Sequence, residues 1–378
     1  MKSININNLI EFRKNLHKHP ELSGIEIETA QNVKDFVSAF NPDKIIENLG
    51  GHGIAFIFEG LSKGKTIMLR CELDGILVDE QNEVFYKSVN KGTSHSCGHD
   101  GHMAIMAGVA QYLSKNKIAK GRVVLLFQAA EENGAGAKAV IEDPKFKEIE
   151  PDYIFALHNL PGFEKHKIIL KETEFASASK GMKVKLKGKS SHASEPENGI
   201  SPDYALSLII NEFKQFCEDF DFFCMVTIIY AHLGEKKFGI NPSELEFGAT
   251  FRAFNDKNLD ELSFLAAESI KEIAKAESLS CEISWHEEFP ATVNNNHCVG
   301  IIDNSAKKIE LNFEYLEEPL KFGEDFGYFL QIYNGSLFGL GSGTEHPRLH
   351  YNNYDFPDEL IKTGIGMFTS IINILGVK

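Results

Sequence analysis

The sequence predicts an α/β protein in which a mostly parallel sheet is covered by helices on both faces and carries an inserted α+β domain. Apolar strand segments alternate with amphipathic helix segments over the first part of the chain, which is typical of a parallel sheet. From about residue 175 the order becomes β-α-β-β-α-β, the ferredoxin-like unit. The first rhythm then returns. We therefore expect one domain from residues 1–174 and 290–378 and an inserted domain from residues 175–289.

The first domain is expected to begin with two amphipathic helices, because apolar residues recur there at helical spacing. Six further elements follow before the rhythm changes. The predicted elements are helices at 6–20 and 26–40, strands at 54–58 and 66–71, a helix at 103–113, a strand at 122–127, a helix at 136–142 and a strand at 153–157.

The inserted domain begins where lysines alternate with apolar residues, as in a half-exposed strand. The elements predicted there are a strand at 180–188, a helix at 200–220, strands at 222–232 and 244–254, a helix at 259–276 and a strand at 280–287. After it we expect helices at 297–311 and 323–333, a strand at 336–340 and a final helix from residue 358.

Composition limits the possible partners and the location. The chain has 378 residues, a net charge of −15 and 43% hydrophobic residues. Nucleic acids and anionic membranes favour basic surfaces, so we expect neither as a partner. We see no signal peptide and no apolar run of the ~20 residues that span a membrane. The cysteines lack a disulfide framework spacing, which predicts reduced thiols and a cytoplasmic location. They are Cys71, Cys97, Cys217, Cys224, Cys281 and Cys298.

The segment Ser96–His102 is the strongest candidate for chemistry. It places Cys97, His99, Asp100 and His102 among glycines, directly before a predicted helix. A tight loop can aim a cysteine and a histidine two residues apart at one point, and both are preferred ligands of zinc and similar ions. The alternative is that these polar residues only cap the helix.

Further polar residues follow the predicted strands, where parallel sheets bind ligands. Asp74, the Glu131–Glu132 pair and His158 each lie just past a strand. Two adjacent glutamates point in different directions, so one can bind a metal while the other acts as a general base. The alternative is a solvated acidic pair. His346 and His350 lie in another loop after a strand, and the residues alone do not choose between them.

This set contains too many ligands for one four-coordinate ion that keeps an open position. It suits two ions that share a bridging ligand and a water. Zinc, manganese, cobalt and nickel all tolerate such ligands. In the inserted domain, His192 could reach a substrate oxygen or could simply be exposed. Arg252 lies mid-strand and needs a partner, either a substrate carboxylate or an internal Asp or Glu.

The chain resembles the two-metal aminoacylase and carboxypeptidase family, peptidase family M20, in its amidohydrolase branch. That branch includes hippurate hydrolases and indole-acetyl-amino-acid hydrolases. The matching stretches run nearly from end to end. They are Leu16–Ser23, Arg70–Asp74, Cys97–His102, Gln128–Glu132, His158–Asn159, Ser191–Ala193, Thr250–Arg252, Pro290–Asn294, Gly323–Phe326, Leu349–His350 and Asp355–Glu359.

The resemblance implies two divalent metal ions with Cys97 as the bridging ligand. Glu132 and His350 would complete one site, and His99 and His158 the other. The resemblance favours His350 over His346, because Asp355–Glu359 follows it at the family's spacing.

The resemblance also implies roles in catalysis and substrate binding. Glu131 resembles the base that moves a proton from water to the leaving nitrogen, and Asp74 resembles the acid that supports the ligands. His192 resembles a lid histidine that helps to hold the carbonyl oxygen, often in the partner subunit's site. Arg252 resembles the residue that grips the substrate carboxylate. Asn241 stands where the family has a substrate-binding asparagine, in a shorter segment.

We therefore predict a metal-dependent amidohydrolase that cleaves the amide of N-acyl amino acids, hippurate-like compounds or acyl-amino-acid conjugates. The alternative on the same scaffold is a dipeptidase or carboxypeptidase. A non-catalytic metal or ligand carrier is the alternative from another class. The resemblance favours a homodimer or higher homo-oligomer that forms through the inserted domain, which would then act as a lid and dimerisation domain.

Overall fold

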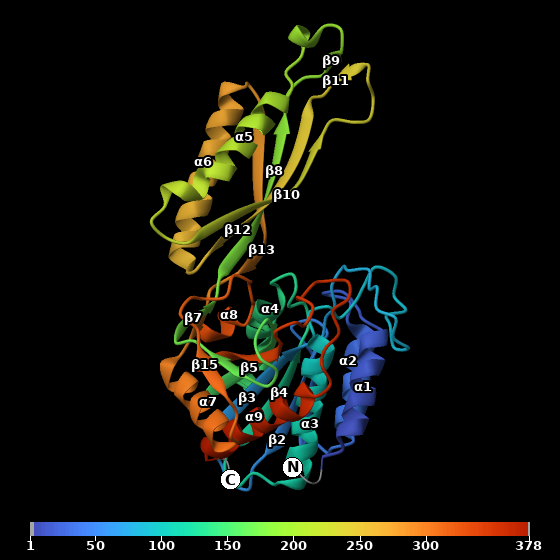
Figure 1. Ribbon diagram of the computed structural model, residues 1–378, viewed down its shortest axis with the longest axis vertical. Coiled ribbons are helices and arrows are strands. Elements are labelled where there is room, and N and C mark those ends of the chain that lie inside the picture. Colours follow the sequence, from blue (N-terminus) through green and yellow to red (C-terminus); the bar gives the residue numbers. More distant parts are fainter. Residues whose placement is uncertain (1–3, 377–378) are drawn as a thin grey trace. The chain divides into compact units, whose positions relative to one another are not determined.

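The computed structural model describes residues 4–376, and the chain divides into two compact units (Figure 1). Unit 1 consists of Met1–Phe175, Thr292–Pro319 and Asp325–Lys378. Unit 2 consists of Ala176–Ala291 and Leu320–Glu324. Unit 2 is thus built almost wholly from one continuous stretch, and the chain returns to unit 1 on either side of it.

Unit 1 is built on an eight-stranded sheet with the order β1-β2-β4-β3-β5-β16-β6-β15. The central strands β4, β3, β5 and β16 pair in parallel. The edge strand β1 pairs antiparallel with β2, and β2 joins β4 in the same way. The predicted mostly parallel sheet is therefore confirmed. Its strands are β1 Lys44–Leu49, β2 Gly53–Glu59, β3 Thr66–Glu72, β4 Arg122–Gln128, β5 Tyr153–Pro161, β6 Ile168–Leu170, β15 Phe313–Tyr315 and β16 Gly335–Gly343.

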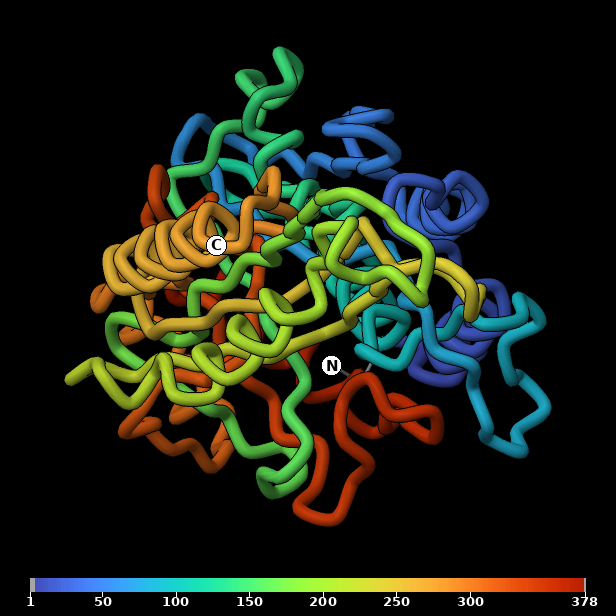
Figure 2. The backbone as a smooth tube through the Cα atoms, turned by 90° about the horizontal axis from the view of Figure 1, so that it is seen from above, coloured from blue at the N-terminus to red at the C-terminus, as the bar shows by residue number. Residues whose placement is uncertain are grey.

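Helices cover both faces of this sheet, as predicted (Figure 1). The helices α1, α2, α3, α7 and α9 share one apolar core with the sheet. Figure 2 shows α1 and α2 lying side by side. On the other face, α4 packs against β4 and α8. The helices are α1 Ile6–Lys18, α2 Ile27–Ser38, α3 His99–Lys115, α4 Gly136–Glu142, α7 Asn296–Lys308, α8 Gly327–Leu330 and α9 Leu360–Ile374.

Two predicted elements of unit 1 differ from the structure, and the strands β1, β6 and β15 were not predicted. The three apolar residues of β1 do not alternate with its three polar ones, so the segment lacks the usual strand pattern. The predicted helix at 323–333 is reduced to the four residues of α8. Asp325 instead uses its buried carboxylate to accept hydrogen bonds from the Gln128 side chain and the Ala137 backbone, both at 2.7–2.8 Å. The strand β5 extends to Pro161, so His158 lies within the strand rather than after it.

Unit 2 has the predicted ferredoxin-like order, β8-α5-β10-β12-α6-β13. Its antiparallel sheet has the order β10-β12-β8-β13, and α5 and α6 share its apolar core. The predicted helix at 200–220 ends earlier, in a 3-10 turn at Phe216–Asp219. A separate ribbon pairs β9 with β11, and β7 pairs with β14. The elements of unit 2 are β8 Ala178–Lys187, β9 Ser191–His192, α5 Asp203–Gln215, β10 Cys224–Leu233, β11 Ile240–Asn241, β12 Glu244–Ala253, α6 Asp256–Ala276 and β13 Ser280–Phe289. The short strands β7 Thr173–Ala176 and β14 Thr292–Asn294 belong to unit 1, except for Ala176.

The state of the cysteines and the search for membrane-spanning helices concern the whole chain. Cys217 and Cys224 form a disulfide, so the expectation of six reduced thiols is wrong for this pair. The two cysteines flank the turn between α5 and β10, which brings them together although their spacing carries no framework pattern. The other four cysteines are free thiols. Among residues 4–376, no helix is both long enough and apolar enough to cross a membrane.

Candidate metal centre

The polar residues of unit 1 gather where the parallel strands β3, β4 and β5 end and α3 begins. Cys97 precedes α3 and His99 is its first residue. Gly98 between them has a left-handed backbone with φ of 93° and lies against the Asn159 side chain, so a Cβ at this position would clash. This glycine therefore allows the loop to approach β5 closely enough for Cys97 to meet His158.

The five predicted metal ligands form two triads that share Cys97. The first triad is Cys97, His99 and His158, and the second is Cys97, Glu132 and His350; within each, the ligand atoms lie within 4.8 Å of one another. Cys97 Sγ lies 3.4 Å from His158 Nε2, and His350 Nε2 lies 3.7 Å from Glu132 Oε2. Two neighbouring ions with one bridging thiolate would need this arrangement.

The imidazole rings of the first triad are oriented by backbone carbonyls. His99 Nδ1 donates to the Asp74 carbonyl oxygen at 2.9 Å, and His158 Nδ1 donates to the Asn159 carbonyl oxygen at 2.9 Å. In the neutral form of each ring, Nε2 is therefore the unprotonated nitrogen that faces the triad, as in metal-binding histidines. Within residues 4–376, the buried His99 Nε2 finds no hydrogen-bond partner, so a cation would satisfy it.

The electrostatics of the triads also suit bound cations. Burial and the neighbouring His102 lower the pKa of His158 to about 3, which keeps it in the neutral, metal-binding form. Burial, Glu132 and Glu131 hold the pKa of the Cys97 thiol well above its usual value. A buried thiol among carboxylates ionises only beside a positive charge, and a coordinated ion supplies that charge. The residues present therefore fit a pair of metal ions.

The turn after β4 separates the two adjacent glutamates. Ala130 has a left-handed backbone with φ of 55°, and its N–H donates to the buried Glu26 carboxylate at 2.7 Å. The turn sends Glu132 into the second triad, while Glu131 Oε2 lies 3.9 Å from His99 Nε2. Glu131 also lies close enough to His99 and Glu132 to share a cation with them. A carboxylate beside a metal site is well placed to exchange protons with water.

Asp74 contacts one ligand of each triad, His99 of the first and Glu132 of the second. Its Oδ2 accepts hydrogen bonds from Ser23 Oγ at 2.7 Å and from the Glu132 backbone N–H at 2.9 Å. Its backbone oxygen holds the His99 ring, and its Oδ1 lies 3.5 Å from His99 Nδ1. Although burial raises the pKa of Asp74, the contacts with His99 and the Glu132 N–H lower it below its ordinary value, so the group is a carboxylate.

Comparison with known proteins identifies the family. Residues 68–374 match the model of Peptidase family M20/M25/M40. The chain belongs to this family. The resemblance seen in the sequence is thereby confirmed, and this member of family M20 is a metal-dependent amidohydrolase.

Several relatives of this M20 protein have named activities. Over 366 residues it is 29% identical to a hippurate hydrolase of Campylobacter jejuni, covering 96% of this chain and 94% of the relative. It is 30% identical to an N-acetyl-L-cysteine deacetylase of Bacillus subtilis, covering 90% and 82%. It is 29% identical to thermostable carboxypeptidase 1 of Saccharolobus solfataricus, covering 92% and 88%. Among solved structures, a dinuclear metal-binding peptidase of Bacillus subtilis has the same fold, with a TM-score of 0.81 at 24% identity over 98% of both chains.

This M20 protein also has a buried chain of hydrogen-bonded polar groups next to the triads, to which the sequence assigned no role. His102 Nδ1 lies 2.6 Å from Glu72 Oε2, and His102 Nε2 lies 2.5 Å from Asn159 Oδ1. Asn159 Nδ2 in turn donates to the Tyr354 hydroxyl at 2.5 Å. The available signal was the spacing of His99 and His102, since residues three apart lie on one face of a helix.

The three other predicted site residues lie in unit 2. His192 is exposed, and its Nδ1 lies 2.7 Å from Ser194 Oγ. It belongs to the β9–β11 ribbon, where it pairs with Ile240, and Asn241 pairs with Ser191. The structure thus brings His192 and Asn241 together on one ribbon, away from the sheet of unit 2.

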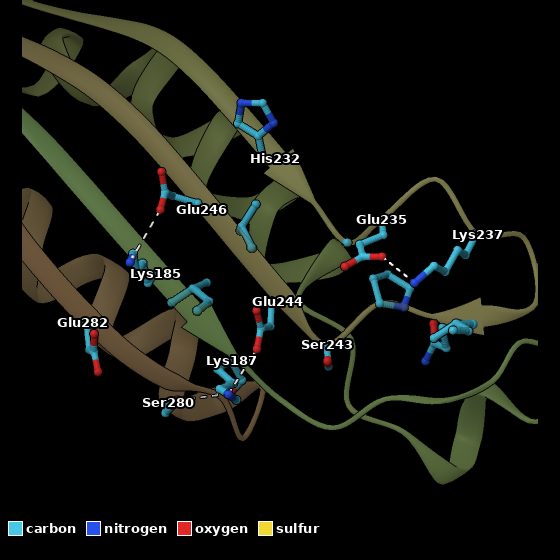
Figure 3. A pocket seen from close by; sticks show the side chains of 16 residues that line it. Lys185, Lys187, His232, Glu235, Lys237, Ser243, Glu244, Glu246, Ser280 and Glu282 are labelled. Atoms are coloured by element: carbon cyan, nitrogen blue, oxygen red, sulfur yellow. Dashed lines mark hydrogen bonds and ion pairs between the residues drawn. The ribbon is translucent and has the colours of Figure 1, made fainter.

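Asn241 also lines a cavity of about 610 Å³ at the end of the unit 2 sheet (Figure 3). Lysines and glutamates of the adjacent strands line this cavity and pair with one another, as Lys187 does with Glu244 at 3.1 Å. These mutual ion pairs leave little net charge to attract a ligand. The cavity lies wholly within unit 2 and contains none of the candidate metal ligands.

Arg252 lies mid-strand in β12, where its Nη1 donates to the Lys321 carbonyl oxygen at 3.1 Å. Burial lowers the pKa of Arg252. Within residues 4–376, no carboxylate pairs with it, so the internal Asp or Glu that the sequence left open is absent from the described part of the chain. A half-buried guanidinium with only a carbonyl partner is suited to an external anion.

Proposed function

We propose that this protein cleaves the amide bond of N-acyl amino acids, such as hippurate-like compounds or acyl-amino-acid conjugates. The observation that carries the proposal is the pair of ligand triads that share Cys97 and lie beside the carboxylate of Glu131. The names of the hippurate hydrolase and the N-acetyl-L-cysteine deacetylase support acyl amino acids as the substrate class.

The cofactors in this proposal are two divalent ions drawn from zinc, manganese, cobalt and nickel, all of which accept thiolate, imidazole and carboxylate ligands. Cys97, His99 and His158 would hold one ion, and Cys97, Glu132 and His350 the other. When bound, such ions polarise an amide carbonyl and lower the pKa of water to about 7. The dinuclear metal-binding structure with the same fold supports two ions rather than one.

The chain's own residues would then perform the proton transfers and hold the substrate. Glu131 takes a proton from the attacking water and delivers it to the leaving nitrogen. Asp74 keeps the ligands oriented. Arg252 grips the substrate carboxylate in a bidentate manner, and Asn241 contributes a further hydrogen bond. His192 donates a hydrogen bond to the carbonyl oxygen as negative charge develops on it.

We further propose a cytoplasmic homodimer that forms through unit 2, in which His192 serves the partner's site. The exposed position of His192 on a separate ribbon supports this arrangement. The edge strand β10 offers a surface, because its Ile229 is 60% exposed and Leu233 is 37% exposed. Cys97 and three other free thiols support a reducing compartment, although the Cys217–Cys224 disulfide does not.

A dipeptidase or carboxypeptidase is the second candidate function. The thermostable carboxypeptidase of Saccharolobus solfataricus, which matches 92% of this chain, favours it. The two functions share the metal centre and differ in the group on the acyl side of the scissile bond. A peptide substrate carries an α-amino group there, whereas an N-acyl amino acid does not.

A substrate panel tests the proposal. Purified protein reconstituted with each of the four metals would be assayed with N-benzoylglycine, N-acetyl amino acids and dipeptides, and with N-benzoylglycinamide as a carboxylate-free control. We expect acyl amino acids to give the highest kcat/KM and the amide control to lose activity. Preference for dipeptides would favour the second candidate. No hydrolysis with any metal, by protein that binds two ions, would favour a metal carrier.

A further inference from the structure

Behind the candidate metal centre lies a second buried polar cluster, centred on Arg13 of α1. Arg13 and His17 lie four residues apart, so both project from one face of the helix, and both side chains are buried. Asp100, which follows His99, accepts hydrogen bonds from Arg13 Nη1 at 3.0 Å and from His17 Nδ1 at 2.8 Å. The N-terminal helix therefore holds the first turn of α3, where His99 lies.

The same guanidinium also binds the segment that follows His350. Arg13 Nη1 donates to Asp355 Oδ1 at 2.7 Å, and Arg13 Nε lies 2.7 Å from Asp358 Oδ1. Tyr86 fixes this arrangement, because its hydroxyl donates to Asp355 Oδ2 at 2.6 Å and its ring lies 4.9 Å from the guanidinium carbon. Arg13 thus joins the two parts of the chain that carry ligands of different triads.

The ligands of the two triads differ in how far their positions depend on the contacts of Arg13. His99 and His158 belong to a helix and a strand, and a backbone carbonyl orients each ring. His350 lies in a segment, residues 344–359, that contains no helix or strand. Its N–H donates to the Ser96 carbonyl oxygen at 2.9 Å, and its side chain is 55% exposed. The position of His350 therefore depends on how its segment is anchored.

We propose that Arg13 is a positioning residue that sets the distance between the two triads. Its loss would selectively weaken the ion held by Cys97, Glu132 and His350. The reason is that Arg13 contacts Asp100, Asp355 and Asp358 together. Without it His17 still faces Asp100, but Asp100 and the carboxylates of the 355–358 segment lose their shared cation, and like charges repel. This inference rests on the proposed two-ion centre.

Metal titration tests the inference without an activity assay. Isothermal titration with Zn²⁺ and with Mn²⁺, followed by elemental analysis after dialysis, would be performed on the wild type, Arg13→Met and Asp355→Asn. Asp355 is half-exposed, so its variant is expected to fold even if Arg13→Met does not. Arg122→Met is the matched control, because Arg122 lies at the other end of β4 and pairs with Glu59 at 3.9 Å.

We expect the wild type and Arg122→Met to bind two ions per chain. Arg13→Met and Asp355→Asn should keep the first ion and bind the second about 10–100-fold more weakly, the usual effect of losing a residue that orients metal ligands. Equal weakening of both ions, or no weakening in folded Asp355→Asn, would overturn the inference and leave the two-ion centre intact. A wild type that binds fewer than two ions would overturn the proposed centre itself.

Discussion

The candidate residues of unit 1 and those of unit 2 are held in opposite ways. In unit 1, Cys97, His99 and His158 are buried, and hydrogen bonds to the backbone orient both rings. In unit 2, His192 is exposed and Arg252 has one carbonyl partner. Gathering charged and polar groups costs free energy, and contacts that hold metal ligands in position before the ion binds offset this cost. Residues that meet a substrate can remain solvated until it arrives. The comparison predicts that substitutions in unit 1 change metal binding or chemistry. Those in unit 2 should change substrate binding or turnover and leave metal binding unchanged.

The largest expected effect comes from Glu131→Gln. The amide keeps the shape of the carboxylate but cannot accept a proton, so kcat should fall by about 10²–10⁴-fold, the contribution of a general base. Both ions should remain, as measured by elemental analysis. Glu132→Gln is the matched control, because its carboxylate belongs to the second triad and its loss should remove an ion. Full turnover by Glu131→Gln would exclude Glu131 as the base.

The second-largest effect is expected for Cys97→Ser, which should lower metal affinity rather than remove a proton-transfer step. A serine hydroxyl stays protonated where a thiol ionises beside a cation, so both triads lose their shared anion. We expect affinity for both ions to fall by more than about 100-fold, beyond the effect of losing a residue that only orients a ligand. Cys281→Ser, which changes a half-buried free thiol of unit 2, is the control and should retain both ions. Unchanged metal content in Cys97→Ser would contradict the shared-ligand arrangement.

His192→Ala tests the unit 2 side of the comparison. Loss of a hydrogen bond to the developing oxyanion should lower kcat by about 10²–10³-fold, with both ions retained. If His192 serves the partner's site, mixing this variant with Glu131→Gln should restore activity. Random pairing leaves one complete site in each mixed dimer, so about a quarter of wild-type activity per chain is expected. A mixture as inactive as its parts would show that His192 does not act across a dimer.

The same difference between the units explains how much the sequence could predict. Cys97 and His99 stand two apart among glycines, and Glu131–Glu132 directly follows an apolar strand, so local pattern identified them. His350 could be chosen over His346 only through the family resemblance. In the structure, His346 Nε2 is directed to the Asp355 carbonyl oxygen at 2.8 Å, a contact that no spacing rule reveals.

Long-range contacts account for most of what was missed. Arg13 lies 342 residues before Asp355, yet the two side chains form an ion pair. The carboxylate of Asp325 is drawn into a buried site with Arg70, at 2.5 Å, where the sequence predicted a helix. For Asp325 a tertiary ion pair outweighs the local helix propensity, and for Arg13 it adds a contact that local propensity does not indicate. Such pairs leave no periodic signal in the sequence.

The smallest expected effect comes from the turn that separates the glutamates. Ala130 adopts φ of 55°, a conformation that costs an L-residue about 1–2 kcal/mol relative to glycine. Ala130→Gly should therefore raise the free energy of unfolding by about 0.5–1 kcal/mol, after the greater entropy of glycine in the unfolded chain is subtracted. Thr173→Gly is the control, since Thr173 has φ of 63° but lies outside the centre. Both variants should gain stability in denaturant titrations, and only Ala130→Gly should lower kcat, because the looser turn holds Glu131 less firmly. Equal kcat in the two variants would mean that the strained turn does not position Glu131.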